Sequence, residues 1–344
     1  MRTVLHAGMT KAGSSSIQAT LRNLTMKDWV YPDMSPTGNL TGVFATLFWI
    51  APETHHAAKA QGFDADVIAR RKSNWQNKLD TLIEETDKDL IFSAEVISNT
   101  DVEGLTAARD YFAARSERVE VMAYVRPPVA YMQSAFQQLL KGSKLDTLNL
   151  NVVWPKYQLR LSRLDEVFGR ENVTLKLFDP AAFVGGDVVQ DFCADLGIDI
   201  DPAQCLRVNE SLSLEATALL FAQRNKGEGL EMGMPNTLQR NNRFIQALSS
   251  IGSAKLKFSA AAVAPVIERN RADIDWIEAR LGCSVLDAAA PKGPFIETDQ
   301  DLLDVAAKSA GLLQERLTQM LEARTDDPFA QVLRNIEVLR QLSA

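Results

Sequence analysis

The first 24 residues of the chain place a short apolar run, a glycine-containing loop and an amphipathic segment in direct succession. Residues 3–5 form the apolar run, residues 8–13 the loop, and residues 14–24 carry apolar side chains at helical spacing. This order predicts a buried strand whose carboxyl end leads directly into a helix N-terminus. Such an N-terminus binds anions, because its free N–H groups and the positive end of the helix dipole point to the same place. We therefore predict a site for a phosphate-like group in this loop.

The position of Lys11 distinguishes the loop from that of nucleotide triphosphatases. Their pattern, GxxxxGK followed by Ser or Thr, has its lysine directly after the last glycine, whereas Lys11 stands two residues before Gly13. The order Lys-x-Gly-Ser-Ser resembles the 5′-phosphosulfate-binding loop of sulfotransferases, and residues 6–18 are similar to the opening of bacterial members of that family. A plain strand-to-helix turn, as in any α/β protein, is the alternative interpretation.

This resemblance implies a binding loop for the donor 3′-phosphoadenosine 5′-phosphosulfate (PAPS). The chain departs from the family at two kinds of position. Serines stand where the family usually has threonines after the loop glycine, and a threonine replaces the proline or histidine before the lysine. The serines keep the hydroxyl donors, and Thr10 loosens the match without removing a known contact. The implied donor-binding residues are Thr10, Lys11, Ala12, Gly13, Ser14, Ser15 and Ser16.

A second segment points to the same ligand. Residues 119–125 are apolar with few breaks, which is typical of a parallel strand buried on both faces. Arg126 follows at the strand's carboxyl end, where ligands bind in open α/β sheets, and Ser134 lies in the helix predicted over 129–140. Sulfotransferases hold the 3′-phosphate of PAPS with an arginine and a serine at this spacing, so the resemblance implies that role for both residues. Alternatively, Arg126 only caps the strand and Ser134 lies on a solvated helix face.

The catalytic candidates lie at two strand ends. The strand predicted from residue 89 leads into Glu95, and a carboxylate is a usual general base for a hydroxyl that attacks as it loses its proton. The resemblance also implies a glutamate base after this strand. His6 is the rival base, because histidine titrates near neutral pH. Lys11 would stabilise the charge that develops on the departing phosphate. A carboxylate that only favours the dipole of the following segment is the alternative for Glu95.

A third segment precedes a later helix. Arg207 and Asn209 lie in a stretch that is similar to an Asn-x-Ser-Leu-Ser segment near the nucleotide in related sulfotransferases. The resemblance therefore implies that both contact the nucleotide. Asn and Ser before a helix are also frequent helix caps, which is the alternative.

The alternation of strands and helices predicts an α/β protein: a three-layer P-loop-like fold with a mostly parallel central sheet flanked by helices. We expect a PAPS-binding core over residues 1–215 and a helical region over residues 216–344. The helical region would pack on the core at the acceptor side or form a contact in a possible homodimer; the sequence leaves both open.

Composition narrows the function classes. The chain of 344 residues has a net charge of −7, which argues against a broad nucleic-acid surface. It has no apolar run long enough to span a membrane. Three cysteines without a CxxC pair, and a start that leads directly into the first strand, predict a cytoplasmic protein without a signal peptide. With only three histidines, we expect no metal site.

The resemblance therefore implies a bacterial sulfotransferase that moves a sulfuryl group from PAPS to a hydroxyl. The acceptor would be a glycan, a lipid or a small metabolite, and the nucleotide product would be 3′-phosphoadenosine 5′-phosphate (PAP). Two alternatives remain: a P-loop kinase or NTPase, and a nucleotide-binding protein of the same fold without catalytic activity.

Overall fold

The computed structural model describes residues 1–54, 63–142, 145–208, 211–227, 237–286 and 294–322, with isolated positions at 329, 332, 333 and 336. The chain forms two compact units. The first comprises residues 1–134, 153–210 and 265–290, and the second residues 135–152, 211–264 and 291–344. Both units contain segments from before and after residue 215. The division into a core over residues 1–215 and a helical region over residues 216–344 stays a prediction.

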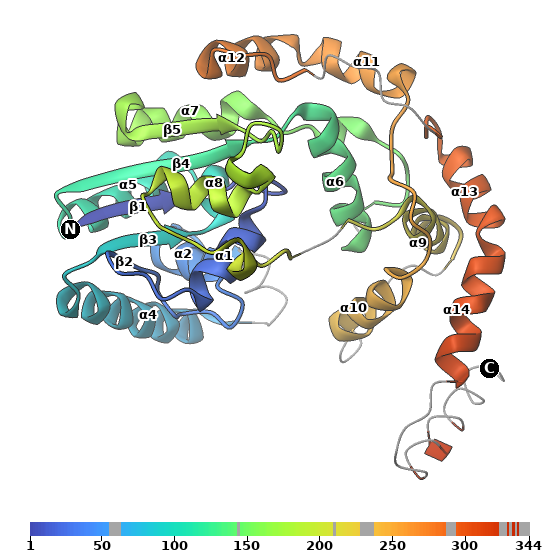
Figure 1. Ribbon diagram of the computed structural model, residues 1–344, viewed down its shortest axis with the longest axis horizontal. Helices are drawn as coiled ribbons and strands as arrows, with labels where there is room; N and C mark the ends of the chain where they lie inside the picture. The colour runs from blue at the N-terminus through green and yellow to red at the C-terminus, as the bar shows by residue number, and fades with distance from the viewer. Residues whose placement is uncertain are drawn as a thin grey trace. The chain divides into compact units, whose positions relative to one another are not determined.

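The first unit is built on a five-stranded sheet with the order β2-β3-β1-β4-β5 (Figure 1). Neighbouring strands pair in parallel throughout. This confirms the predicted fold class, a mostly parallel central sheet flanked by helices with a helical C-terminal region. The strands are β1 Arg2–His6, β2 Trp29–Val30, β3 Asp89–Ser93, β4 Arg118–Val125 and β5 Val173–Leu177.

Helices flank this sheet in two groups: α1 packs against α8, and α7 packs against α5 and α12. Aspartates begin several of these helices by accepting a backbone N–H, as Asp64 does for α4 and Asp187 for α8. The helices of the unit are α1 Ser14–Asn23, α2 Thr41–Phe48, α4 Ala65–Glu85, α5 Val102–Ala113, α7 Tyr157–Phe168, α8 Val188–Asp195 and α12 Arg271–Leu281.

The three central strands are buried on both faces, which explains their nearly continuous apolar sequences. Leu5 of β1, Phe92 of β3 and Tyr124 of β4 are fully buried. Tyr124 also donates a hydrogen bond of 2.7 Å to Asp191 on α8, so the polar end of this buried ring is satisfied.

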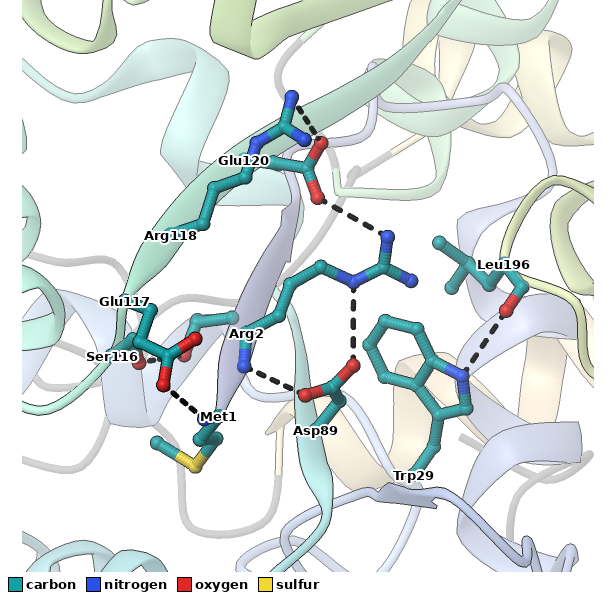
Figure 2. Close-up of polar contacts among 10 residues, drawn as sticks. Met1, Arg2, Trp29, Asp89, Ser116, Glu117, Arg118, Glu120 and Leu196 are labelled. Carbon is teal, nitrogen blue, oxygen red and sulfur yellow. Dashed lines mark hydrogen bonds and ion pairs between the residues drawn. The ribbon is translucent and has the colours of Figure 1, made fainter.

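A polar cluster ties the strands together where they begin (Figure 2). The backbone N–H of Arg2 donates to Asp89 at 2.7 Å, and its guanidinium forms ion pairs with Asp89 and Glu120 at 3.4 and 3.5 Å. The same guanidinium lies 4.6 Å from the ring centre of Trp29. Arg2 thus links β1 to β3, β4 and β2. Because the strands are parallel, their carboxyl ends meet at the opposite edge, where the predicted site residues follow.

The second unit is helical. Its helix α9 packs against α10 and α13, and the rings of Phe136, Phe221 and Phe258 pack together. Within the helical region predicted over residues 216–344, residues 328–342 fall largely outside the described residues. No helix in the described part of the chain is long and apolar enough to cross a membrane. The helices are α9 Leu214–Lys226, α10 Thr237–Leu248, α13 Asp299–Lys308 and α14 Ala310–Glu322, while α6 Pro128–Lys141 and α11 Ala260–Arg269 contribute residues to both units.

Candidate active site

The loop between β1 and α1 requires glycine at its last position. Gly13 has a φ of +80°, and a Cβ there would lie 2.6 Å from a methyl carbon of Val188. Lys11 also adopts a left-handed conformation, with a φ of 70°. That conformation costs a non-glycine residue about 1–2 kcal/mol, so the surrounding contacts must hold Lys11 in place.

The start of α1 leaves backbone donors open. The helix has no side-chain cap. The N–H groups of Ala12 and Ser16 already donate within the loop, at 3.2 and 3.0 Å. The predicted anion site therefore has fewer backbone donors than the loop contains, because only N–H groups without an acceptor inside the protein remain for a ligand. Among the described residues of the loop and the first helical turn, such groups belong to Gly8, Thr10, Lys11, Gly13, Ser14 and Ser15.

Glu95 and Lys11 lie close enough for their charges to interact. Glu95 begins a short 3₁₀ segment, η2 Glu95–Asn99, directly after β3. Burial raises the pKa of Glu95, while Lys11 and a hydrogen bond with Ser14 oppose that rise. Burial lowers the pKa of Lys11. The charge of Glu95 opposes this decrease in pKa, and the charge of Arg126 adds to it. The structure therefore brings the predicted base, the loop lysine and the predicted phosphate-binding arginine together.

Arg126 joins this group from the end of β4. Its Nη1 donates to the backbone carbonyl of Lys11. Its Nε is buried and has no hydrogen-bond partner within the described residues. Its guanidinium carbon lies 5.6 Å from the ring centre of Phe178, and burial lowers the pKa of the group. The guanidinium thus keeps a buried donor available for an anion, a pattern that suits a phosphate.

Ser134 is buried in α6, with 6% of its surface exposed. The alternative that it lies on a solvated helix face is therefore wrong. Its hydroxyl forms no hydrogen bond with another residue of the described ranges. Whether Ser134 and Arg126 hold one phosphate stays a prediction.

The segment that contains Arg207 lies along α1. The N–H groups of Leu206 and Val208 donate to the hydroxyls of Thr20 and Ser16, at 2.9 and 3.1 Å. The side chain of Arg207 is largely exposed and forms an ion pair of 3.5 Å with Asp187. Arg207 thus lies beside the helix that carries the loop serines. Asn209, the other residue predicted in this segment, lies outside the described residues.

His6 is fully buried in the core. Its Nδ1 lies 2.7 Å from the hydroxyl of Ser93, which also accepts from Gln18 at 3.1 Å. Its Nε2 has no partner among the described residues, and its ring packs 5.1 Å from that of Phe192. Burial lowers the pKa of His6 to about 3, so this imidazole is neutral at pH 7.

Helix α7 contributes polar residues that the sequence patterns did not single out. Arg160 donates to the hydroxyl of Tyr131 at 2.8 Å, and that hydroxyl lies 3.3 Å from the hydroxyl of Thr10 in the loop. Arg163 donates to the carbonyl of Thr100 at 3.4 Å. The signal in the sequence that could have identified them is their spacing of three residues, which places two arginines on one face of a helix.

A cavity of about 420 Å³ lies elsewhere in the first unit, lined in part by Arg2, Glu120, Lys176 and Asp195. Its cations are already paired: Arg2 with Glu120 at 3.5 Å, and Lys176 with Asp195 at 2.6 Å. It therefore offers an anion no unpaired charge. No group of three or more metal-ligating side chains occurs within the described ranges.

No family model matches the chain. An uncharacterized protein of Archaeoglobus fulgidus is 23% identical over 136 residues, which cover 39% of this chain and 37% of that protein's length. The sulfotransferase from Alicyclobacillus acidocaldarius has a TM-score of 0.39 and 19% identity, covering 65% of this chain and 92% of that one. The sulfotransferase domain of the Synechococcus PCC 7002 olefin synthase has a TM-score of 0.32 and 14% identity, covering 79% of this chain and 93% of the domain.

Proposed function

We propose that the protein is a PAPS-dependent sulfotransferase that acts on a hydroxyl of a glycan, a lipid or a small metabolite. One observation carries the proposal: Arg126, from the second motif, donates to the backbone of Lys11 in the first. The two segments that resemble the PAPS-binding motifs thus meet at one edge of the sheet. A ligand with two separate anionic groups suits such a pair of sites.

The donor-binding residues fit a doubly charged nucleotide. The open N–H groups of Gly13 to Ser15, with Lys11, would hold the 5′-phosphosulfate. The buried Nε of Arg126 is a donor without a partner among the described residues, and a 3′-phosphate would satisfy it. The serine hydroxyls, Ala12, Ser134, Arg207 and Asn209 complete the proposed set of contacts. The donor supplies the sulfuryl group as a phosphosulfate anhydride.

Glu95 and Lys11 would have different roles in the transfer reaction. Glu95 would accept the proton of the attacking hydroxyl, and its raised pKa brings it closer to the pH at which a general base works best. Lys11 would stabilise the negative charge that develops on the departing phosphate. We rank His6 below Glu95 as a candidate base, because a fully buried imidazole with a pKa of about 3 is a weak base.

The two alternatives predict different ligands. A kinase or NTPase would bind ATP with magnesium, and its lysine would follow the last loop glycine. Lys11 instead lies two residues before it. A binding protein without catalysis would hold PAP equally well but would not need a raised pKa at Glu95.

Transfer of radiolabelled sulfate from PAPS to a library of hydroxyl compounds tests the proposal. We expect a labelled product with the wild-type chain and a loss of about 10²–10⁴-fold with Glu95→Gln. Glu166→Gln is the matched control, because Glu166 is exposed on α7 and undergoes the same change. PAP binding that survives in Glu95→Gln would separate lost chemistry from lost folding. Unchanged transfer by Glu95→Gln would contradict the role of this residue.

A further inference from the structure

One face of α7 reaches the carboxyl ends of two strands. Tyr157, Arg160 and Arg163 are spaced three residues apart, so they share a helix face. Each donates a hydrogen bond to a residue near the loops that end the strands. Their acceptors are the carbonyl of Arg126 at 2.6 Å, the hydroxyl of Tyr131 at 2.8 Å and the carbonyl of Thr100 at 3.4 Å.

Neither arginine on this face has a counter-charge among the described residues. Arg160 and Arg163 are both partly buried, and neither forms an ion pair with a carboxylate of the described residues. Each donates to a neutral oxygen instead. Of the two acids that follow on α7, Asp165 already binds Arg280 with two hydrogen bonds of 2.8 and 2.9 Å. Glu166 is exposed and forms no ion pair with Arg163 in the described part of the chain. Because no carboxylate of the described residues neutralises either guanidinium, this pair of arginines can take an anion from outside.

These arginines lie on a helix that contacts the segment beginning at Glu95, because α7 packs against η2. The hydroxyl that accepts from Arg160 lies 3.3 Å from Thr10, the neighbour of Lys11 in the loop. Arg160 is therefore close to the loop through Tyr131 and Thr10, but it is not itself one of the residues proposed to bind the nucleotide.

We infer that the acceptor carries an oxyanion, a carboxylate, phosphate or sulfate ester, in addition to its reacting hydroxyl, and that Arg160 binds it with help from Arg163. This inference rests on the proposed function, since it concerns the acceptor of that reaction. The planar guanidinium donates two parallel hydrogen bonds to such groups. The net charge of −7 does not oppose it, because a local pair of cations decides the field at this place.

Matched probe compounds can test the inference by binding alone. The full chain is saturated with PAP, and 4-hydroxyphenylacetate, 4-hydroxyphenyl phosphate and 4-hydroxyphenyl sulfate are compared with the neutral 4-hydroxyphenylacetamide by calorimetry. Glucuronate against glucose provides a sugar pair. We expect at least one anion to bind about 10- to 100-fold more tightly than its neutral counterpart, as for hydrogen bonds to a charged group. The anion that binds most tightly identifies the oxyanion.

Arg160→Gln should abolish this preference for the anion and leave the affinities for PAP and for the neutral probe unchanged. Arg170→Gln is the control, because Arg170 is exposed and undergoes the same loss of charge. Equal binding of charged and neutral probes, a preference that persists in Arg160→Gln, or no anion binding at millimolar concentration would each overturn the inference while PAP binding upholds the nucleotide site. If PAP itself does not bind, the proposed function fails and the inference fails with it.

Discussion

The guanidinium of Arg126 donates a hydrogen bond to the backbone carbonyl of Lys11, across 115 residues of sequence. Lys11 has a positive φ, so its backbone needs contacts that hold it there. Arg126 supplies one such contact and keeps its buried Nε for a ligand. Arg126 thus helps to hold the backbone of the loop and also contributes a positive charge to the candidate site.

Replacing Lys11 by alanine should remove activity and leave the fold intact. The side chain would stabilise charge in the transition state, and the loss of one preorganised donor costs about 10²–10³-fold in turnover. Sulfate transfer measured with Lys11→Ala, beside Lys27→Ala as an exposed control, checks this. A Lys11→Ala enzyme within threefold of the wild type, by the same assay, would show that the lysine has no role in the reaction.

Gly13→Ala should lower the free energy of unfolding by more than the strain of a positive φ at residue 13 alone explains. The new Cβ would meet Val188 at 2.6 Å, in addition to the strain of a positive φ. Gly282→Ala is the control, since Gly282 has a φ of +74° and no atom within 4 Å of the added Cβ. We expect about 1 kcal/mol for the control and about 2–4 kcal/mol for Gly13→Ala by urea unfolding.

The clash can be separated from the strain with a double variant. Val188→Ala removes the methyl groups that the new Cβ would meet. In the Gly13→Ala background it should therefore cost less free energy of unfolding than it does alone. Additive effects would show that Val188 does not limit residue 13.

Turnover should depend on pH through two groups whose pKa values have moved toward each other. The raised pKa of Glu95 places the acidic limb above the ordinary glutamate range, because activity falls as this base is protonated. The lowered pKa of Lys11 places the alkaline limb below the ordinary lysine range, because activity falls as this cation loses its proton. A pH profile of kcat/KM measures both limbs, and one that stays flat down to the ordinary glutamate range would contradict the role of Glu95.

Stability should fall in acid because of His6. Its pKa is about 3 in the folded protein and 6.5 when exposed, so between these values the unfolded chain binds the additional proton. The free energy of unfolding should therefore drop by up to about 1.4 kcal/mol per pH unit as the pH falls below 6.5. His6→Gln should reduce this slope. An equal slope in the wild type and in His6→Gln would show that His6 does not cause the loss.

Local patterns were enough to predict much of the first unit. The loop from Gly8 to Gly13 marks the end of β1 and the start of α1, and the apolar run before Arg126 marks β4. Glycine and proline mark turns and loops, so such element boundaries can be predicted from the sequence. The two-residue strand β2 and the helix α5 were missed, because β2 is too short to show a period and α5 mixes small and charged residues.

Properties that depend on tertiary contacts could not be read from the sequence. His6 follows a strand and looks able to titrate near neutral pH, but burial lowers its pKa to about 3. Arg160 and Tyr131 come from different helices, and only folding brings the tyrosine hydroxyl to Thr10. In the same way, the link between Arg126 and Lys11 needed the parallel order of β1 and β4.

Calorimetric titration of the nucleotide site tests the central claim most directly. PAP and AMP differ only by the 3′-phosphate, so their difference in affinity measures what the second motif contributes. We expect PAP to bind about 10- to 100-fold more tightly than AMP without magnesium, the effect of one or two charge-assisted hydrogen bonds. Ser134→Ala should narrow that difference without removing the contact between Arg126 and Lys11. Equal affinity for PAP and AMP, or a preference for ATP with magnesium, would contradict a site built for PAPS.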